Sequence, residues 1–270
     1  MKRWIARVLT LIFLVGTAAG CGHSGNTFLK EASPETSALA LYCYDGEEVR
    51  REFLFDVKEI KEVLKELSAV DIKPAEGWTP KDVEGPVYGV EIGRKDGYTL
   101  FGAWSNGYWI TEEGEAYEFA YDFEQLEAGH EWTNGDVFHT INVLPCARHL
   151  VQNGDEWNST LLTPAEEGEV PEDISIKITE QSEKSLKAEI INNRQEEWMF
   201  GEYFSLEVDV DGEWCQVPTA PGNWAFTDIG LVLLAGQTME KEYSFEMYGE
   251  LPAGNYRLVV ENITAEFTVE

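Results

Sequence analysis

Basic residues are scarce in this chain of 270 residues. Lysine and arginine number 20 against 50 aspartates and glutamates, which gives a formal net charge of −30. No basic residue occurs between Lys95 and Arg148, an interval that holds ten acidic residues. Such a surface repels nucleic acid and anionic lipid headgroups, because both carry negative charge. The composition therefore argues against nucleic acid as a partner and favours solubility, cations or a basic partner.

Catalytic sequence signatures are also missing. The chain contains no G-x-S-x-G, H-E-x-x-H or C-x-x-C motif and no Walker or G-x-G-x-x-G loop. These motifs mark serine hydrolases, zinc proteases, thiol redox sites and nucleotide-binding loops. Carboxylate pairs for glycoside hydrolysis carry no signal, because so many acidic residues produce pairs by chance. We therefore predict no cofactor, no catalytic residue and a non-enzymatic role.

Metal ligation has weak support. One acid-rich interval holds four candidate ligands: His130, Glu131, Asp136 and His139. Their spacing matches no zinc pattern, so we interpret them as loop residues. Asp209, Asp211 and Glu213 alternate around a glycine without the EF-hand pattern, and a hairpin turn explains them. We predict no metal site.

The first 21 residues have the layout of an export signal. Lys2, Arg3 and Arg7 form a basic start, residues 8–15 are mostly apolar, and small residues lead to Cys21. This order is typical of a cleaved leader, and the apolar run is short for a membrane span.

The end of this leader resembles a bacterial lipobox. The residues are Ala18-Ala19-Gly20-Cys21, with alanine where leucine is usual. The resemblance implies that Cys21 is lipid-modified after removal of residues 1–20. Residues 21–37 would then be a tether, and the lipid would anchor the protein to the outer face of the cell membrane. An ordinary secretory leader cleaved near Ala19, or an uncleaved anchor, is the alternative.

Three further cysteines follow Cys21. Cys43 and Cys146 are candidates for a disulfide outside the cytoplasm, which would leave Cys215 over. The alternative is three buried thiols, since connectivity does not follow from sequence.

Residues 38–160 predict an α+β domain, with helices packed on an antiparallel meander. Aromatic-rich segments end at successive turn dipeptides, which indicates strands over 39–43, 49–55, 87–93, 98–104, 108–111 and 116–121. A short helix over 122–128 and an amphipathic segment over 137–150 complete the region.

The clearest helix is predicted over residues 57–67. Asp56 is a suitable N-cap with Glu59 three residues on. The apolar stripe at helical spacing consists of Val57, Ile60, Val63, Leu64 and Leu67. This stripe favours packing on the sheet.

Tryptophans give the best hint of binding. Four of them lie in or beside the meander: Trp78, Trp104, Trp109 and Trp132. Exposed rings would stack on sugars or hold a peptide, whereas core packing is the usual role of aromatic strand residues. We therefore name these residues as candidate binding aromatics.

Residues 161–171 are rich in proline, glycine and glutamate, which indicates a linker. About seven short strands follow, over 174–178, 186–190, 204–210, 214–217, 239–247, 256–260 and 265–269. Their regular spacing predicts a β-sandwich over 172–270.

This last region resembles a bacterial immunoglobulin-like (Ig-like) domain of exported proteins of Gram-positive bacteria. The resemblance rests on four segments: 201–207, Trp214 with Val217-Pro218, 225–230 and 251–257. It implies a sandwich without the antibody-type disulfide, Tyr256 as a corner residue, and no catalytic residues. It does not extend to residues 36–155.

The sequence therefore predicts a membrane-anchored lipoprotein that binds an envelope protein or glycan. The alternative is an extracellular hydrolase, or a hydrolase accessory, that acts on sugar or peptide through residues 38–155. A sensor or inhibitor of another envelope protein is a third option.

Overall fold

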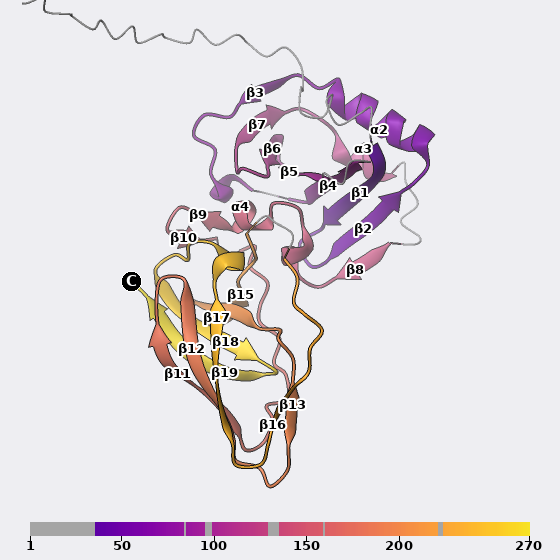
Figure 1. Cartoon of the computed structure of the whole chain (residues 1–270). Coiled ribbons are helices and arrows are strands. Elements are labelled where there is room, and N and C mark those ends of the chain that lie inside the picture. Colours follow the sequence, from indigo (N-terminus) through magenta and orange to yellow (C-terminus); the bar gives the residue numbers. More distant parts are fainter. Residues whose placement is uncertain (1–35, 84, 95–98, 129–134, 159, 221–223) are drawn as a thin grey trace, which may run out of the picture.

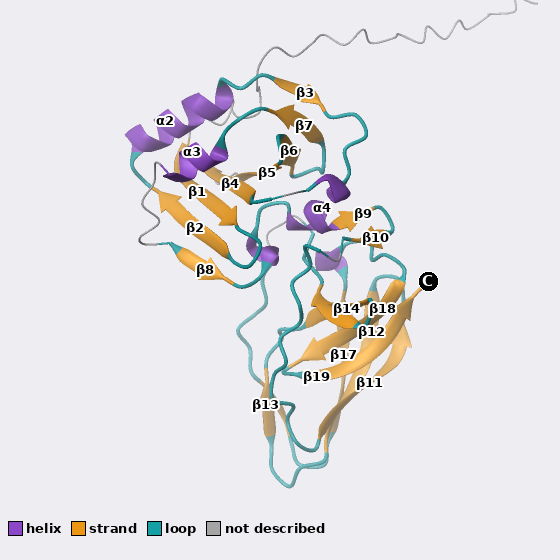
Figure 2. Ribbon diagram, turned by 180° about the vertical axis from the view of Figure 1, so that it is seen from behind, coloured by secondary structure: helices purple, strands orange, loops and turns teal. Residues whose placement is uncertain are grey.

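The computed structural model describes residues 36–270 except 84, 95–98, 129–134, 159 and 221–223. The described chain is mostly β-structure with few helices (Figures 1 and 2). None of these helices has the length and apolar character needed to cross a membrane.

An eight-stranded antiparallel sheet forms the N-terminal part, in the order β3-β7-β6-β5-β4-β1-β2-β8. Its strands are β1 (Thr36–Tyr44), β2 (Val49–Leu54), β3 (Ile72–Pro74), β4 (Val87–Arg94), β5 (Thr99–Ser105), β6 (Tyr108–Thr111), β7 (Ala116–Phe119) and β8 (Asp136–Phe138). The consecutive strands β4 to β7 pair in sequence order. These four strands therefore run as an antiparallel meander.

Helix α2 (Val57–Ser68) begins where the sequence predicts. The Asp56 carboxylate accepts hydrogen bonds from the backbone N–H groups of Lys58 and Glu59 at 2.9 and 3.0 Å. These bonds satisfy donors that the first helical turn leaves open. The buried face carries Ile60, Val63, Leu64 and Leu67. Helix α2 therefore covers the sheet, and only Val57 of the predicted stripe stays exposed.

Both faces of this sheet are buried, as alternation along β1 shows. Leu39, Leu41 and Cys43 belong to the core cluster that contains α2 and α3 (Phe123–Ala128). Ala40 and Tyr42 belong to a second cluster, which continues into the C-terminal part. Since successive strand residues point to opposite faces, β1 contributes to two cores at once.

The predicted amphipathic segment 137–150 is not one element. It contains β8, the 3₁₀ helix η2 (Ile141–Val143) and the short helix α4 (Ala147–Val151). The strands β9 (Gln152–Asn153) and β10 (Glu156–Trp157) follow as a small hairpin. A further 3₁₀ turn, η1 (Pro80–Asp82), lies in the loop before β4.

The C-terminal part consists of three sheets with the orders β11-β12-β17, β13-β16 and β15-β14-β18-β19. The elements are β11 (Ile174–Gln181), β12 (Ser185–Asn192), β13 (Trp198–Phe200), β14 (Ser205–Val210), β15 (Glu213–Gln216), β16 (Leu231–Leu233), β17 (Thr238–Ser244), η3 (Glu246–Tyr248), β18 (Gly254–Val260) and β19 (Ile263–Val269). The seven predicted strands all occur, and β13 and β16 are additional.

The larger two sheets enclose one core. Leu186, Ala188 and Ile190 alternate along β12 and are fully buried, in the same cluster as Leu258 and Val260 of β18. Every second residue of these strands therefore packs inside the sandwich.

Tight turns join the strands of the sandwich. Asp211 and Gly212 have φ values of 55° and 90° between β14 and β15, and Asp209 Oδ1 accepts from Gly212 N at 2.8 Å. This two-residue turn suits paired strands because its twist matches theirs. The predicted hairpin is confirmed, and it accounts for the acidic residues around Gly212.

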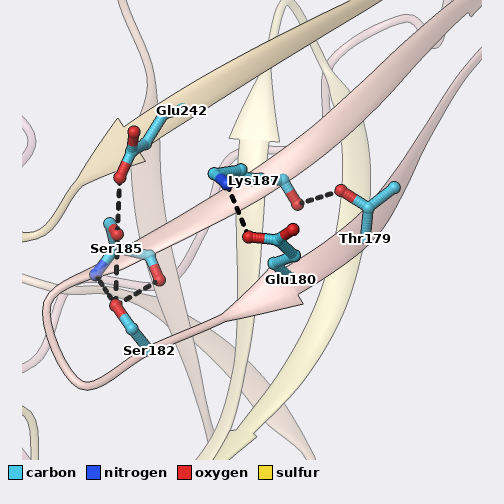
Figure 3. A network of polar contacts seen from close by, with 6 residues as sticks. All are labelled: Thr179, Glu180, Ser182, Ser185, Lys187 and Glu242. Atoms are coloured by element: carbon cyan, nitrogen blue, oxygen red, sulfur yellow. Dashed lines mark hydrogen bonds and ion pairs between the residues drawn. The ribbon is translucent and has the colours of Figure 1, made fainter.

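The β11–β12 hairpin carries a surface network of polar contacts (Figure 3). Ser182 Oγ accepts from Ser185 N at 2.9 Å, and Ser185 Oγ donates to Glu242 Oε1 at 2.9 Å. Lys187 Nζ lies 2.6 Å from Glu180 Oε2. Exposed pairs of this kind contribute little to stability, because solvent screens their charges. The network is therefore a local turn and strand contact.

The segment predicted as a linker, residues 161–171, is partly built into the fold. Thr163 O accepts from Gln216 N at 2.8 Å, and Ala165 N donates to Trp214 O at 2.8 Å. Leu162 is buried in the second core cluster, the one that continues into the C-terminal part. An extended backbone can pair with an open strand edge whatever its side chains. Composition alone therefore did not reveal this contact with β15.

The two parts of the chain meet around Arg148 of α4, which is 4% exposed. Its Nη1 donates to Pro218 O at 3.2 Å and its Nη2 to Glu250 O at 2.6 Å. Its Nε donates to Gln152 Oε1 at 2.5 Å, and the guanidinium carbon lies 4.6 Å from the Trp157 ring centre. Burial lowers the pKa of Arg148 to about 10, so the side chain stays charged at neutral pH.

A tyrosine corner lies beside this contact. Tyr256 is fully buried, and its hydroxyl donates to Pro252 O at 2.6 Å. The same oxygen accepts from Trp157 Nε1 at 3.0 Å. The predicted corner is confirmed, and Trp157 extends it to the segment that leaves the N-terminal sheet. Figure 1 shows α4, β9 and β10 between the two parts.

Arg148→Met should lower the free energy of unfolding by about 3 kcal/mol, because two buried carbonyl oxygens lose charged donors. Guanidinium chloride unfolding followed by tryptophan fluorescence measures the change. Arg194→Met is the matched control, since Arg194 Nε makes one exposed bond to Glu172 O at 2.7 Å. Equal losses in the two variants would contradict a special role for Arg148.

Candidate binding groove

A hollow in the described surface lies on the C-terminal sandwich, at the level of β13 and β16. It has a volume of about 430 Å³ and is formed by residues 199–203, residues 226–230 and Glu261. Figure 1 shows β13 and β16 at the end of the molecule away from the N-terminal sheet. The groove is therefore remote from the contact around Arg148.

Strand alternation builds one wall of the groove. Trp198 and Phe200 of β13 point inward and are buried, whereas Met199 between them is 64% exposed. Met199 pairs with Val232 of β16, which is 44% exposed. This two-stranded ribbon therefore presents apolar side chains to solvent as well as to the core.

Aromatic rings connect the groove to the core of the sandwich. Tyr203 and Phe226 meet edge to face with ring centres 5.1 Å apart, and Phe204 meets Phe226 at 5.5 Å. Phe204 is buried and also contacts Tyr243 of β17 at 5.2 Å. Such edge-to-face pairs have a preferred geometry. The loops of the groove are therefore held on the sandwich core by packed rings.

A buried asparagine fixes the ribbon to the sandwich. Asn192 is fully buried at the end of β12, and its Nδ2 donates to Glu196 O at 2.9 Å and to Leu233 O at 2.9 Å. Its Oδ1 accepts from Arg194 N at 2.9 Å. A buried amide that is satisfied in this way specifies one arrangement of the backbone around it. Asn192 therefore positions β13 and β16.

Carboxylates surround the apolar surface. Glu202, Asp228 and Glu261 line the groove, and no basic residue is among the described residues that form it. Glu261 Oε1 accepts from Gly201 N at 3.2 Å, and Glu202 pairs with Lys241 at 2.7 Å. The groove is therefore an apolar surface with an acidic rim.

Exposure of the apolar residues distinguishes this groove from the core. Tyr203 is 60% and Ile229 is 54% exposed, close to the exposed Met199. Large apolar side chains that gather on a surface mark contact sites more often than single exposed ones do. The arrangement suits binding, because it offers apolar area and anionic oxygen atoms but no paired acid, base or nucleophile.

The domain that carries the groove has a known family. Residues 168–270 match the family described as bacterial Ig-like domain. No curated protein and no solved structure shows significant similarity to the chain. The match agrees with the sandwich and the tyrosine corner, and it begins within the predicted linker. The Ig-like domain thus accounts for the C-terminal part of the fold.

The tryptophans predicted as a binding platform lie elsewhere. Trp109 is buried, and a Cβ atom on Gly102 would come within 1.9 Å of its ring. Trp104 is partly buried, and its Nε1 donates to Phe119 O at 2.9 Å. Both belong to the core beneath α2, because their strand positions face that side of the sheet.

The other two candidate aromatics do not join them. Trp78 is partly buried and packs against the second core cluster. Trp132 lies outside the described residues. The structure therefore does not bring Trp78, Trp104 and Trp109 together on one surface.

The candidate disulfide between Cys43 and Cys146 is not formed in the structure, which has the alternative of three thiols. Cys43, Cys146 and Cys215 are buried thiols. Cys43 belongs to the cluster on the α2 side of the sheet, and Cys146 to the cluster on the other side. Two side chains on opposite faces of a sheet cannot bring their sulfur atoms together. The fold therefore keeps these cysteines apart.

Cys146 and His149 do not form a catalytic pair. Cys146 precedes α4 with φ 60°, and burial raises the pKa of its thiol to about 12. His149 Nε2 lies 2.9 Å from Glu112 O, so this nitrogen is engaged with the backbone. A nucleophilic cysteine needs a lowered pKa and access to substrate. The environment of Cys146 has the opposite effect.

Of the four candidate metal ligands, His139 is exposed, Asp136 is in an ion pair and the other two lie outside the described residues. Asp136 pairs with Arg51 at 2.5 Å. His130 and Glu131 fall outside the described part of the chain. Among the residues described, no three histidine, cysteine or acidic side chains gather as a metal site would require.

Cys21, the residue expected to carry the lipid, also lies outside the described residues.

The groove residues themselves were missed by sequence reasoning. Segments 201–207 and 225–230 were read only as family resemblance, and β13 and β16 were not predicted. A usable signal exists in the apolar residues at 229 and 231–234, where alternation gives way to a continuous run. Such a run in a short strand predicts apolar side chains on both faces.

Thiol titration checks the separation of the cysteines. In residues 22–270, which include every described residue, no thiol should react rapidly with Ellman's reagent in the native protein, because all three are buried. After unfolding in guanidinium chloride without reductant, all three should react. A single reactive thiol in the unfolded protein would show that a disulfide exists.

Proposed function

We propose that this chain is a lipid-anchored binding protein on the outer face of the cell membrane and that it catalyses no reaction. The exposed apolar groove of the Ig-like domain carries the proposal. Function comes from a site rather than from the fold, and this groove is the described surface best suited to contact a partner. The partner is an envelope protein or glycan.

The division of the chain fits this role. We assign residues 1–20 to a signal peptide, 21–37 to a tether and 38–160 to an α+β domain ahead of the Ig-like domain. The eight-stranded sheet with α2 on one face supports the α+β class. The tether would leave the folded part free to reach beyond the membrane.

The anchor rests on the leader. A basic start, an apolar run and small residues before Cys21 fit a lipoprotein signal, with alanine where leucine is usual. A lipid at Cys21 would attach the protein through its N-terminal end. The groove would then face away from the membrane, because it lies at the end of the molecule opposite the N-terminal sheet (Figure 1).

The hydrolase alternative loses its main support. It requires a cleft in residues 38–155 lined by exposed aromatic and acidic residues. Trp109 is buried, and Trp104 uses its N–H group inside the fold. The groove lies instead in the Ig-like domain. Binding is therefore better supported than turnover.

Lipid modification is tested by metabolic labelling with an alkyne fatty acid in the bacterium that makes the protein. The full-length protein should take up the label and remain with the membrane fraction. Cys21→Ser should abolish labelling, because no thiol is then available at the cleavage site. Cys215→Ser is the matched control and should keep the label. Label that persists in Cys21→Ser would contradict the anchor.

Binding through the groove is tested by capture from envelope extracts on immobilised residues 22–270, with mass spectrometry of what is retained. Ile229→Lys should reduce recovery of the bound component by about tenfold or more, because a charge enters the apolar surface. Val170→Lys is the matched control, since Val170 is 63% exposed and lies outside the groove. Equal recovery from both variants would contradict groove binding.

A further inference from the structure

We infer that the groove of the Ig-like domain binds a short apolar polypeptide segment that carries lysine or arginine. This inference rests on the proposed function and names the class of partner for the same site. It follows from the side chains that line the groove, from the charges around them and from the charge of the whole chain.

The apolar part of the surface sets the first requirement. Met199, Tyr203 and Ile229 offer exposed side chains, and the buried Phe200 lies between the first two in sequence. Methionine adapts its shape, and tyrosine combines an apolar ring with a polar tip. Both residue types are enriched where proteins bind polypeptides. The partner must therefore supply apolar side chains.

The acidic rim sets the second requirement. Asp228 is exposed on the rim and has no ion-pair partner in the described part of the chain. Glu261 accepts from Gly201 N through Oε1, and its other carboxylate oxygen takes no part in that bond. Glu202 is partly compensated by Lys241. A cationic side chain beside the apolar contact would find carboxylate oxygens on two sides of the groove.

The net charge selects among occupants. With a charge of −30, two copies of this chain repel each other, which disfavours a dimer through an acidic groove. The same charge disfavours a surface of anionic lipid. A cationic segment is attracted to the chain before contact by its charge, and the apolar contact then holds it in the groove. Charge complementarity therefore points to a basic polypeptide.

The test uses residues 22–270 and fluorescently labelled octapeptides. One probe alternates lysine and leucine, a second alternates glutamate and leucine, and a third contains lysine alone. Fluorescence anisotropy should show saturable binding of the lysine–leucine probe only. Binding of all three, or equal binding of the all-lysine probe, would overturn the inference.

Two pairs of variants locate the contact. Ile229→Lys should weaken binding of the lysine–leucine probe at least tenfold, or about 1.4 kcal/mol, while Val170→Lys leaves it unchanged. Asp228→Asn should weaken binding about threefold and reduce its salt dependence, because one charge contact is lost. Asp211→Asn, at an exposed hairpin turn, is the control for charge. Equal effects within either pair would overturn the inference.

Other occupants give distinct results. Sedimentation that shows self-association abolished by Ile229→Lys would assign the groove to a second copy. Co-sedimentation with phosphatidylglycerol vesicles that is abolished by the same variant would assign it to lipid. Both results overturn the inference. If capture from envelope extracts depends on Ile229 but the lysine–leucine probe does not bind, the proposed function stands and the basic partner class is wrong.

Discussion

A charged side chain buried between two parts of the chain constrains much of this structure. Arg148 is 4% exposed, and its described hydrogen bonds go to neutral oxygen atoms of Pro218, Glu250 and Gln152. Removing a cation from water is unfavourable unless its donors are satisfied. Two of these acceptors are backbone carbonyls of the Ig-like domain, which must stay where Arg148 can reach them. The contact therefore selects one relative placement of the two parts.

The apolar core cluster that spans both parts of the chain also favours a single relative placement of them. The cluster that holds Tyr42 and Val87 of the N-terminal sheet also contains Tyr256 and Leu258 of the Ig-like domain. Apolar burial stabilises but has little directional preference, whereas hydrogen bonds define orientation. The bond from Trp157 to Tyr256 supplies such a direction beside the apolar contact. A partner bound in the groove would consequently be attached to an Ig-like domain that packs on the N-terminal sheet.

The regular parts of the fold were predictable because their patterns are local. Helix α2 follows from an N-cap and an apolar stripe, and the meander from turn dipeptides between alternating strands. The hairpin at Asp211 and the corner at Tyr256 were also foreseen. The role of Thr163 and Ala165 at the edge of β15 was not, since backbone pairing leaves little trace in side-chain composition. Likewise, the sequence left Trp104 and Trp109 open between core packing and a binding surface, and their strand faces decide for the core.

The groove was unpredictable for a related reason. It depends on β13 and β16, which are only three residues long and carry apolar residues on both faces. Short strands of this kind have no clear period, so sequence alone does not separate Met199, which is exposed, from Phe200, which is buried. Strand alternation separates them once the ribbon is in place, and Asn192 helps to hold the ribbon from the end of β12. A polar residue at the end of β12 thus helps to position the two short strands whose exposed side chains lie at the proposed binding groove.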